Sequence, residues 1–65
     1  MTDRRIEVLE EMKDELYREK AGWEEYAAIE DDAGSRARYE HIAEGLEKAI
    51  KLIDRRIEEI EKEVE

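Results

Sequence analysis

The sequence predicts an all-α protein, a two-helix antiparallel hairpin that homodimerises into a four-helix bundle with coiled-coil-like packing. Three observations predict it. Both halves carry apolar residues at helical spacing, turn-forming residues separate the halves, and a chain of 65 residues is too short to enclose a stable core alone. Cysteine is absent, which excludes disulfides as the source of extra stability. We therefore treat the chain as a single helical-hairpin domain over residues 1–65.

The second half carries the stronger pattern. Its apolar residues alternate steps of four and three, the spacing of a coiled-coil seam, meaning the stripe of core positions along one side of a helix. Charged residues occupy the opposite side, as expected of positions in water. The pattern predicts a helix over residues 35–64. The seam residues are Tyr39, Ala43, Leu46, Ile50, Ile53, Ile57, Ile60 and Val64.

The first half repeats the same spacing and predicts a helix over residues 3–31. Two glutamates, Glu19 and Glu30, interrupt the apolar pattern, and Glu30 is expected opposite Arg36. Polar groups at bundle seams often fix register and partner choice at some loss of stability, so we assign Glu19 and Glu30 that role. The seam positions are Ile6, Leu9, Met12, Leu16, Glu19, Trp23, Tyr26 and Glu30.

A turn over residues 32–34 joins the two predicted helices. Gly34 is expected to terminate the first helix, and Ser35 or Asp32 to cap the second. If the chain reverses there, facing positions should have residue numbers that sum to about 66, and large side chains then meet partners of suitable size. The predicted pairs are Ile6 with Ile60, Leu9 with Ile57, Met12 with Ile53, Leu16 with Ile50, Trp23 with Ala43 and Tyr26 with Tyr39.

Two helices cannot enclose a core, and further apolar residues beside the seams widen the stripe beyond what one partner helix covers. These are Val8, Ala27, Ile29, Ile42 and Ala49. A homodimer of hairpins is the simplest solution, with a higher oligomer or a straightened, longer coiled coil as alternatives. The predicted self-association core is Leu9, Leu16, Trp23, Tyr39, Leu46, Ile50, Ile53, Ile57 and Ile60.

The excess of acidic residues limits the classes of partner that the protein is expected to bind. With 21 acidic and 12 basic residues, the formal net charge of −9 argues against direct binding to nucleic acid or anionic membranes. A basic protein surface is the better match, and we expect it near the turn. The candidate partner-binding residues are Tyr17, Glu24, Glu25, Asp31 and Asp32. No long apolar run and no apolar signal core are present, so a soluble, cytoplasmic protein is expected.

The sequence contains few residues that could form a catalytic or metal-binding site. Ser35 has only His41 as a potential base, almost two helical turns away, and no glycine-rich phosphate loop exists, so we expect no enzyme activity and no cofactor. A ferritin-like metal site needs Glu-x-x-His, but Arg38 precedes His41 at that spacing. His41 and Glu44 share an outer helix face, and no metal site is predicted there or at Glu19 and Glu30.

Several functions remain compatible with these features. A protein-protein interaction or assembly module is favoured, because coiled-coil surfaces without catalytic groups mainly bind other chains. An alternative is an acidic mimic of DNA that inhibits a nucleic-acid-binding protein, for example one encoded by a phage. Its array of carboxylates would be Glu7, Glu10, Glu11, Asp14 and Glu15. Lesser alternatives are a carboxylate and histidine metal-binding bundle, or a designed scaffold without a natural function.

Overall fold

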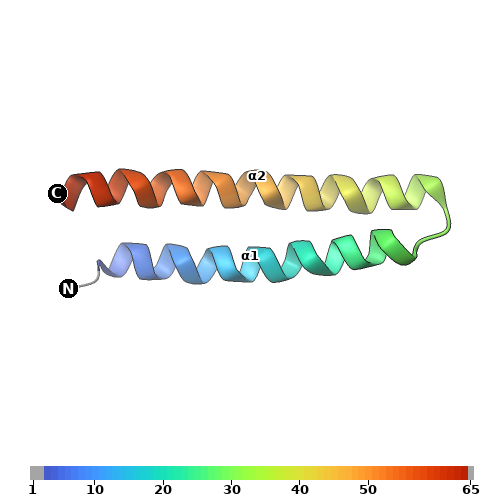
Figure 1. Cartoon of the computed structure of the whole chain (residues 1–65), viewed down its shortest axis with the longest axis horizontal. Coiled ribbons are helices and arrows are strands. Elements are labelled where there is room, and N and C mark those ends of the chain that lie inside the picture. The colour runs from blue at the N-terminus through green and yellow to red at the C-terminus, as the bar shows by residue number, and fades with distance from the viewer. Residues whose placement is uncertain (1–2, 65) are drawn as a thin grey trace.

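The protein folds as two antiparallel helices that pack side by side along their length (Figure 1). The computed structural model describes residues 3–64, so residues 1, 2 and 65 of the predicted domain lie outside the described residues. Helix α1 spans Arg4–Ile29 and helix α2 spans Ala33–Val64, and residues 3–64 contain no strand. The Cα trace measures 50 × 15 × 10 Å. The predicted all-α hairpin is therefore confirmed.

The connection between the helices has the predicted length of three residues but lies two residues earlier in the chain. Helix α1 ends at Ile29 and α2 begins at Ala33, whereas the predicted limits were residues 31 and 35. Glu30 follows α1 in an extended conformation, with φ −81° and ψ 125°. A carboxylate oxygen of Asp32 accepts a hydrogen bond from the backbone N–H of Ser35 at 2.8 Å. Of the two candidate caps, Asp32 therefore fills the position.

Gly34 does not terminate α1, so that prediction is wrong. It lies in the first turn of α2, and no glycine of the chain has a positive φ. A side chain from α2 satisfies the end of α1 instead, because the Arg36 guanidinium donates to the backbone carbonyl of Glu30 at 2.7 and 3.1 Å. Glu30 thus meets Arg36 through its carbonyl, while its carboxylate accepts from the Asp32 N–H at 3.0 Å.

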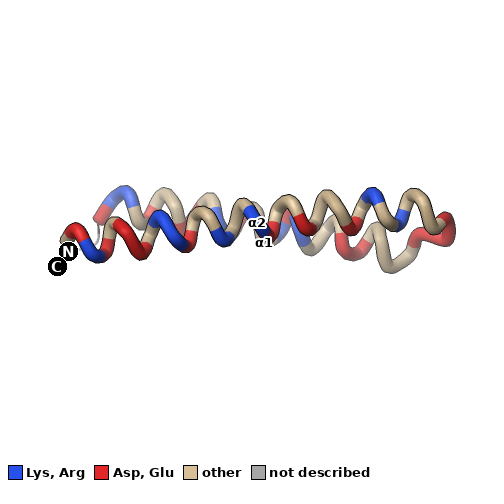
Figure 2. Tube along the Cα trace, turned by 90° about the horizontal axis from the view of Figure 1, so that it is seen from above, with Lys and Arg blue, Asp and Glu red and all other residues tan. Residues whose placement is uncertain are grey.

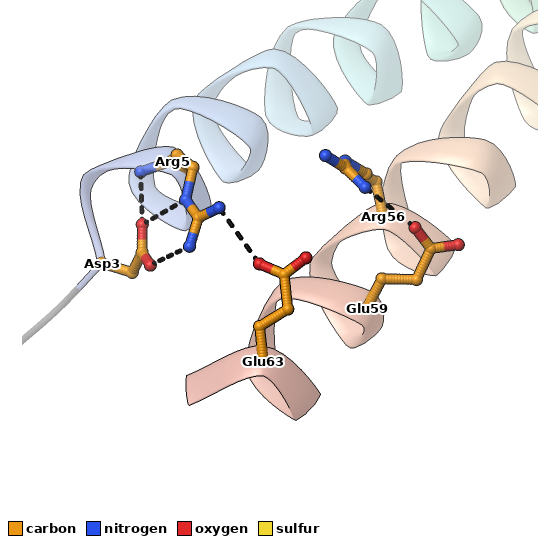
Figure 3. A network of polar contacts seen from close by, with 5 residues as sticks. All are labelled: Asp3, Arg5, Arg56, Glu59 and Glu63. Atoms are coloured by element: carbon orange, nitrogen blue, oxygen red, sulfur yellow. Dashed lines mark hydrogen bonds and ion pairs between the residues drawn. The ribbon is translucent and has the colours of Figure 1, made fainter. Parts of the chain in front are cut away.

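At the other end of the hairpin, Asp3 caps α1 by accepting from the Arg5 backbone N–H at 2.8 Å. The Arg5 guanidinium bonds the same carboxylate, which lowers the pKa of Asp3, and also reaches Glu63 of α2 at 3.2 Å (Figure 3). Beside this network, Arg56 pairs with Glu59 at 3.0 Å. Polar contacts therefore link the two helices where the chain begins and ends.

Most of the hairpin core comes from α2. Its predicted seam supplies Ala43, Ile50, Ile57 and Ile60, while α1 supplies Ala27. The remaining α2 seam residues Tyr39, Leu46 and Ile53 are half-buried, and the last one, Val64, is 65% exposed. Ile50 and Ile60 are only 1% exposed, so they are the best-covered large side chains of the hairpin.

Five of the eight predicted α1 seam positions are half-buried, including Ile6 and Glu30. Leu9, Leu16 and Trp23 are half-buried as expected, but Met12, Glu19 and Tyr26 are exposed. Met12 and Glu19 were therefore wrongly assigned to the packed side of the hairpin. Tyr26 is exposed but faces Tyr39 as predicted, with ring centroids 6.0 Å apart. The residues that follow these three positions are better covered, namely Lys13, Lys20 and Ala27.

Lysines can occupy these seam positions because their aliphatic stems lie along apolar surface while the ammonium groups reach outward. The Nζ of Lys13 lies 2.9 Å from an Asp54 carboxylate oxygen, and that of Lys20 lies 2.9 Å from Glu47. The paired residue numbers sum to 67, close to the predicted 66. The two ion pairs thus fix how α1 and α2 are aligned.

Candidate interaction surface

Two of the ion pairs between the helices, Lys13 with Asp54 and Lys20 with Glu47, define one broad side of the hairpin, here called the charged face. Lys20 bridges Glu47 on α2 and, at 3.7 Å, Glu24 on α1. Hydrogen bonds to Asp54 and Glu47 raise the pKa values of Lys13 and Lys20 respectively. An open hollow of about 630 Å³ on this face is lined by Lys20, Glu24, Ala27, Ala28, Arg36, Glu40, Ala43, Glu44 and Glu47. Six of its nine lining residues are charged and the other three are alanines.

The candidate partner-binding residues do not form one cluster. Tyr17 is 47% exposed and precedes Glu24 by two helical turns on the same side of α1. Glu25 and Asp31 are exposed, and Asp32 is engaged as the α2 cap. The hydrogen bond from the Ser35 N–H lowers the pKa of the Asp32 carboxyl. Carboxylates do gather at the turn (Figure 2), so binding of a basic protein there stays a prediction.

The opposite broad side, here called the apolar face, holds most of the large apolar side chains that the hairpin leaves exposed. In an antiparallel helix pair, positions displaced from both seams in the same rotational sense lie on the same side. Residues of the charged face are displaced from the two seams in one rotational sense, and residues of the apolar face are displaced in the opposite sense. The apolar face consists of Val8, Met12, Tyr26 and Ile29 from α1, and Ile42 and Leu52 from α2.

Two contacts between the helices support this assignment. The ring of Tyr26 lies 6.0 Å from that of Tyr39 between centroids, and Trp23 lies 5.7 Å from Tyr39, so the aromatic cluster opens on this side. At the other end, Val8 of α1 and Arg56 of α2 line the same hollow of about 370 Å³. Both helices therefore contribute to one continuous side from the turn to the chain ends.

The middle of the apolar face is small and polar. Glu15 and Glu19 of α1 are exposed there beside Ala49 of α2. Gly22 and Gly45 complete this part, and a Cβ added to either glycine would meet nothing within 4 Å. The face thus has an apolar patch towards each end, with acidic and small residues between them.

Sequence reasoning assigned Val8, Ile29 and Ile42 to a widened stripe, but it missed Leu52. Leu52 is 61% exposed and continues a second heptad stripe along α2. That stripe, Ile42, Gly45, Ala49 and Leu52, has steps of three, four and three, so the signal was present in the sequence. The stripe was overlooked because glycine and alanine are only weakly apolar and do not stand out as core positions.

The groups considered for chemistry stay dispersed. His41 Nδ1 lies 3.3 Å from a Glu44 carboxylate oxygen, and both side chains are largely exposed. Among residues 3–64, no group of three or more His, Asp or Glu side chains is placed to hold a metal ion. The backbone N–H of Ser35 is bound to Asp32, and His41 instead faces Glu44. No pair of nucleophile and base is formed by Ser35 and His41.

The carboxylate array on α1 is partly neutralised. Glu7 pairs with Arg4 at 3.3 Å, whereas Glu10, Glu11, Asp14 and Glu15 are exposed without an ion pair in the described part of the chain. Away from the turn, basic and acidic segments are interspersed along the hairpin in Figure 2. An uninterrupted row of negative charge, as a phosphate backbone presents, is therefore not formed.

Comparison with known proteins adds no further assignment: no family model, no curated protein and no solved structure matches this chain. Neither α1 nor α2, as described, combines the length and apolar character needed to cross a membrane. The two faces of the hairpin are therefore the features from which a function can be inferred.

Proposed function

We propose that this chain is a protein interaction module that self-associates through its apolar face, so that two hairpins form a four-helix bundle. The observation that carries the proposal is the gathering of Val8, Met12, Tyr26, Ile29, Ile42 and Leu52 on one broad side. Single exposed apolar residues are ordinary on protein surfaces, but several gathered on one side of a small protein indicate an interaction site.

The size of the hairpin supports the same proposal. Five hydrophobic residues are buried in the described chain, four of them from α2. Small domains usually need partner chains, disulfides or metals in addition to such a core. Cysteine is absent, so a partner chain is the natural source of the additional burial.

Sedimentation equilibrium over a dilution series tests the proposal, with far-UV circular dichroism to follow folding. We expect a dimer at micromolar concentration and loss of the dimer on dilution. Leu52→Lys on the apolar face should shift the equilibrium towards monomer, while Tyr17→Lys on the charged face serves as the matched control. Both positions are largely exposed, so both variants should fold. A folded wild-type monomer at every concentration would contradict the proposal.

The acidic-mimic alternative keeps one favourable observation, the four unpaired carboxylates Glu10, Glu11, Asp14 and Glu15 on α1. It predicts binding to a purified basic DNA-binding domain, competed away by duplex DNA and weakened by salt. Charge reversal at Glu11 and Asp14 should abolish this binding and leave self-association unchanged. Unaltered binding in that variant would remove the alternative.

A further inference from the structure

We infer that the second copy docks its apolar face in the antiparallel sense, with its turn over the chain ends of the first copy and the two-fold axis near Glu19 and Ala49. The inference rests on the proposed self-association and specifies its geometry. A two-fold interface is self-complementary, so each residue must face a suitable partner in both directions. The positions on the apolar face allow this requirement to be checked.

Because α1 and α2 are aligned within each hairpin, choosing one facing pair between the two copies fixes the register of the whole dimer. Ion pairs set residue i of α1 level with residue 67 − i of α2, as in Lys13 with Asp54 and Lys20 with Glu47. In the antiparallel arrangement each helix lies over its own copy. Setting Val8 over Ile29 of the second copy pairs the apolar residues nearest the two ends of α1 and fixes every other position.

That one choice brings three further pairs into register. Met12 comes within one residue of Tyr26 of the second copy, so apolar side chains meet again on α1. On α2, Leu52 falls over Gly45 of the second copy, where a Cβ would find open space. Arg38 falls over Glu59 of the second copy, which joins opposite charges.

The parallel arrangement matches less well. It sets α1 over α2 of the second copy at the same level, so Val8 would lie over Glu59 and Ile29 over Arg38. Both placements cover a charged side chain with an apolar one, which is costly. Glu59 would keep only its ion pair with Arg56 of its own chain. The antiparallel arrangement instead pairs these apolar and charged groups with their own kind.

The dimensions of the face suit a stable dimer. A Cα outline of 50 by 15 Å gives an area on the order of 750 Å² before side chains are added. A standard protein interface buries about 800 Å² on each partner. The whole face must therefore be used, and the antiparallel arrangement does use it from the turn to the chain ends.

Charge reversal provides the first test, since Arg38 and Glu59 are both exposed. Homodimers of Arg38→Glu or of Glu59→Arg would each contain two like-charge contacts, whereas their mixture restores two ion pairs. We expect the mixed dimer to bind about tenfold more tightly than either homodimer, by native mass spectrometry. The control is the same exchange at Arg55→Glu and Glu58→Arg, on the outer side of α2, which should show no such preference.

Disulfide formation provides the second test, because the chain contains no cysteine. A mixture of Val8→Cys and Ile29→Cys chains should form a mixed disulfide, which needs Cα atoms within about 7 Å. The matched control is Tyr26→Cys with Ile42→Cys, which the parallel arrangement would join. In the antiparallel arrangement these residues lie about 14 positions, or about 21 Å, apart along the axis.

The results separate the inference from the proposed function. A dimer that links Val8 to Ile29 and prefers the charge-exchanged mixture supports the antiparallel arrangement. A dimer that links Tyr26 to Ile42 overturns it and leaves self-association standing. A wild-type chain that stays monomeric overturns both.

Discussion

The two helices divide the work of folding and association unequally. Among residues 3–64, helix α2 supplies four of the five buried residues, Ala43, Ile50, Ile57 and Ile60, so its apolar seam is used mainly inside the hairpin. Helix α1 supplies Ala27 alone and leaves Met12, Tyr26 and Ile29 exposed. Helix α2 therefore organises the hairpin, whereas α1 carries much of the surface through which a second copy would be bound.

The seam positions of α1 explain this division. Where α2 places isoleucine, α1 places Lys13 and Lys20, whose ammonium groups pair with carboxylates of α2. These lysines cover the seam with their stems, which frees the preceding residues for the apolar face. A helix can therefore serve two partners when its seam is built partly from amphipathic side chains.

The largest expected effect comes from the α2 side of this comparison. Ile50→Ala should lower the free energy of unfolding by about 2–5 kcal/mol, because it empties a fully buried position. Met12→Ala on α1 should lower it far less in dilute solution, where the hairpin is least associated. Urea unfolding of both variants measures the contrast. Equal losses would show that α1 contributes to the core as much as α2.

Glu19→Leu should have the next largest effect, in the opposite direction. The antiparallel arrangement sets Glu19 near its own copy, so leucine removes a repulsion and adds apolar burial of about 1.5 kcal/mol per chain. We expect a higher melting temperature and tighter association. Glu25→Leu, at an exposed position away from the apolar face, is the control. A lower melting temperature for Glu19→Leu would count against Glu19 facing a second copy.

Gly22→Ala should stabilise α1 by about 1 kcal/mol, since alanine has the higher helix propensity and its Cβ enters open space. Gly34→Ala provides a contrast within the first turn of α2. Its Cβ would lie 3.3 Å from a carboxylate oxygen of Asp32, so the gain there should be smaller. Thermal unfolding of the two variants gives the ranking, and a larger gain at Gly34 would contradict it.

The smallest expected effect is on the stability of the turn at low pH. The hydrogen bond from Ser35 lowers the pKa of Asp32 below its usual 3.8, so this carboxylate stabilises the fold above that value. The contribution is lost as the pH falls through the lower pKa of the folded state. Asn retains the capping bond without titrating, so Asp32→Asn should show a shallower loss of melting temperature from about pH 5 to about pH 2. Identical pH profiles would refute this role.

The sequence predicted α2 better than α1 for a physical reason. From Tyr39 to Ile60, every seam position of the heptad pattern is apolar, so the pattern allows one packed side for α2. On α1, Met12 and Tyr26 compete with Lys13 and Ala27 for the same role. Apolar character alone favours Met12 and Tyr26, and only the carboxylates across the hairpin make a lysine seam favourable.

The ends of the helices and the apolar face were less predictable. A glycine between helices normally indicates a terminator, but here Asp32 caps α2 and Arg36 satisfies the end of α1, contacts that depend on the folded turn. The apolar face was expected only as a widened stripe. Its true extent, including Leu52, follows from which residues α1 and α2 leave uncovered when they pack.

The aromatic cluster at the turn gives the protein an intrinsic optical probe. Trp23 is the chain's one tryptophan, and its ring centroid lies 5.8 Å from that of Tyr26 and 5.7 Å from that of Tyr39. Tyrosine emission should therefore be quenched by energy transfer to the indole while the hairpin is closed. Because these rings lie near the turn, their fluorescence reports unfolding there, whereas far-UV circular dichroism averages over both helices. A difference between the two melting curves would reveal that the helices fray from the chain ends while the turn region remains folded.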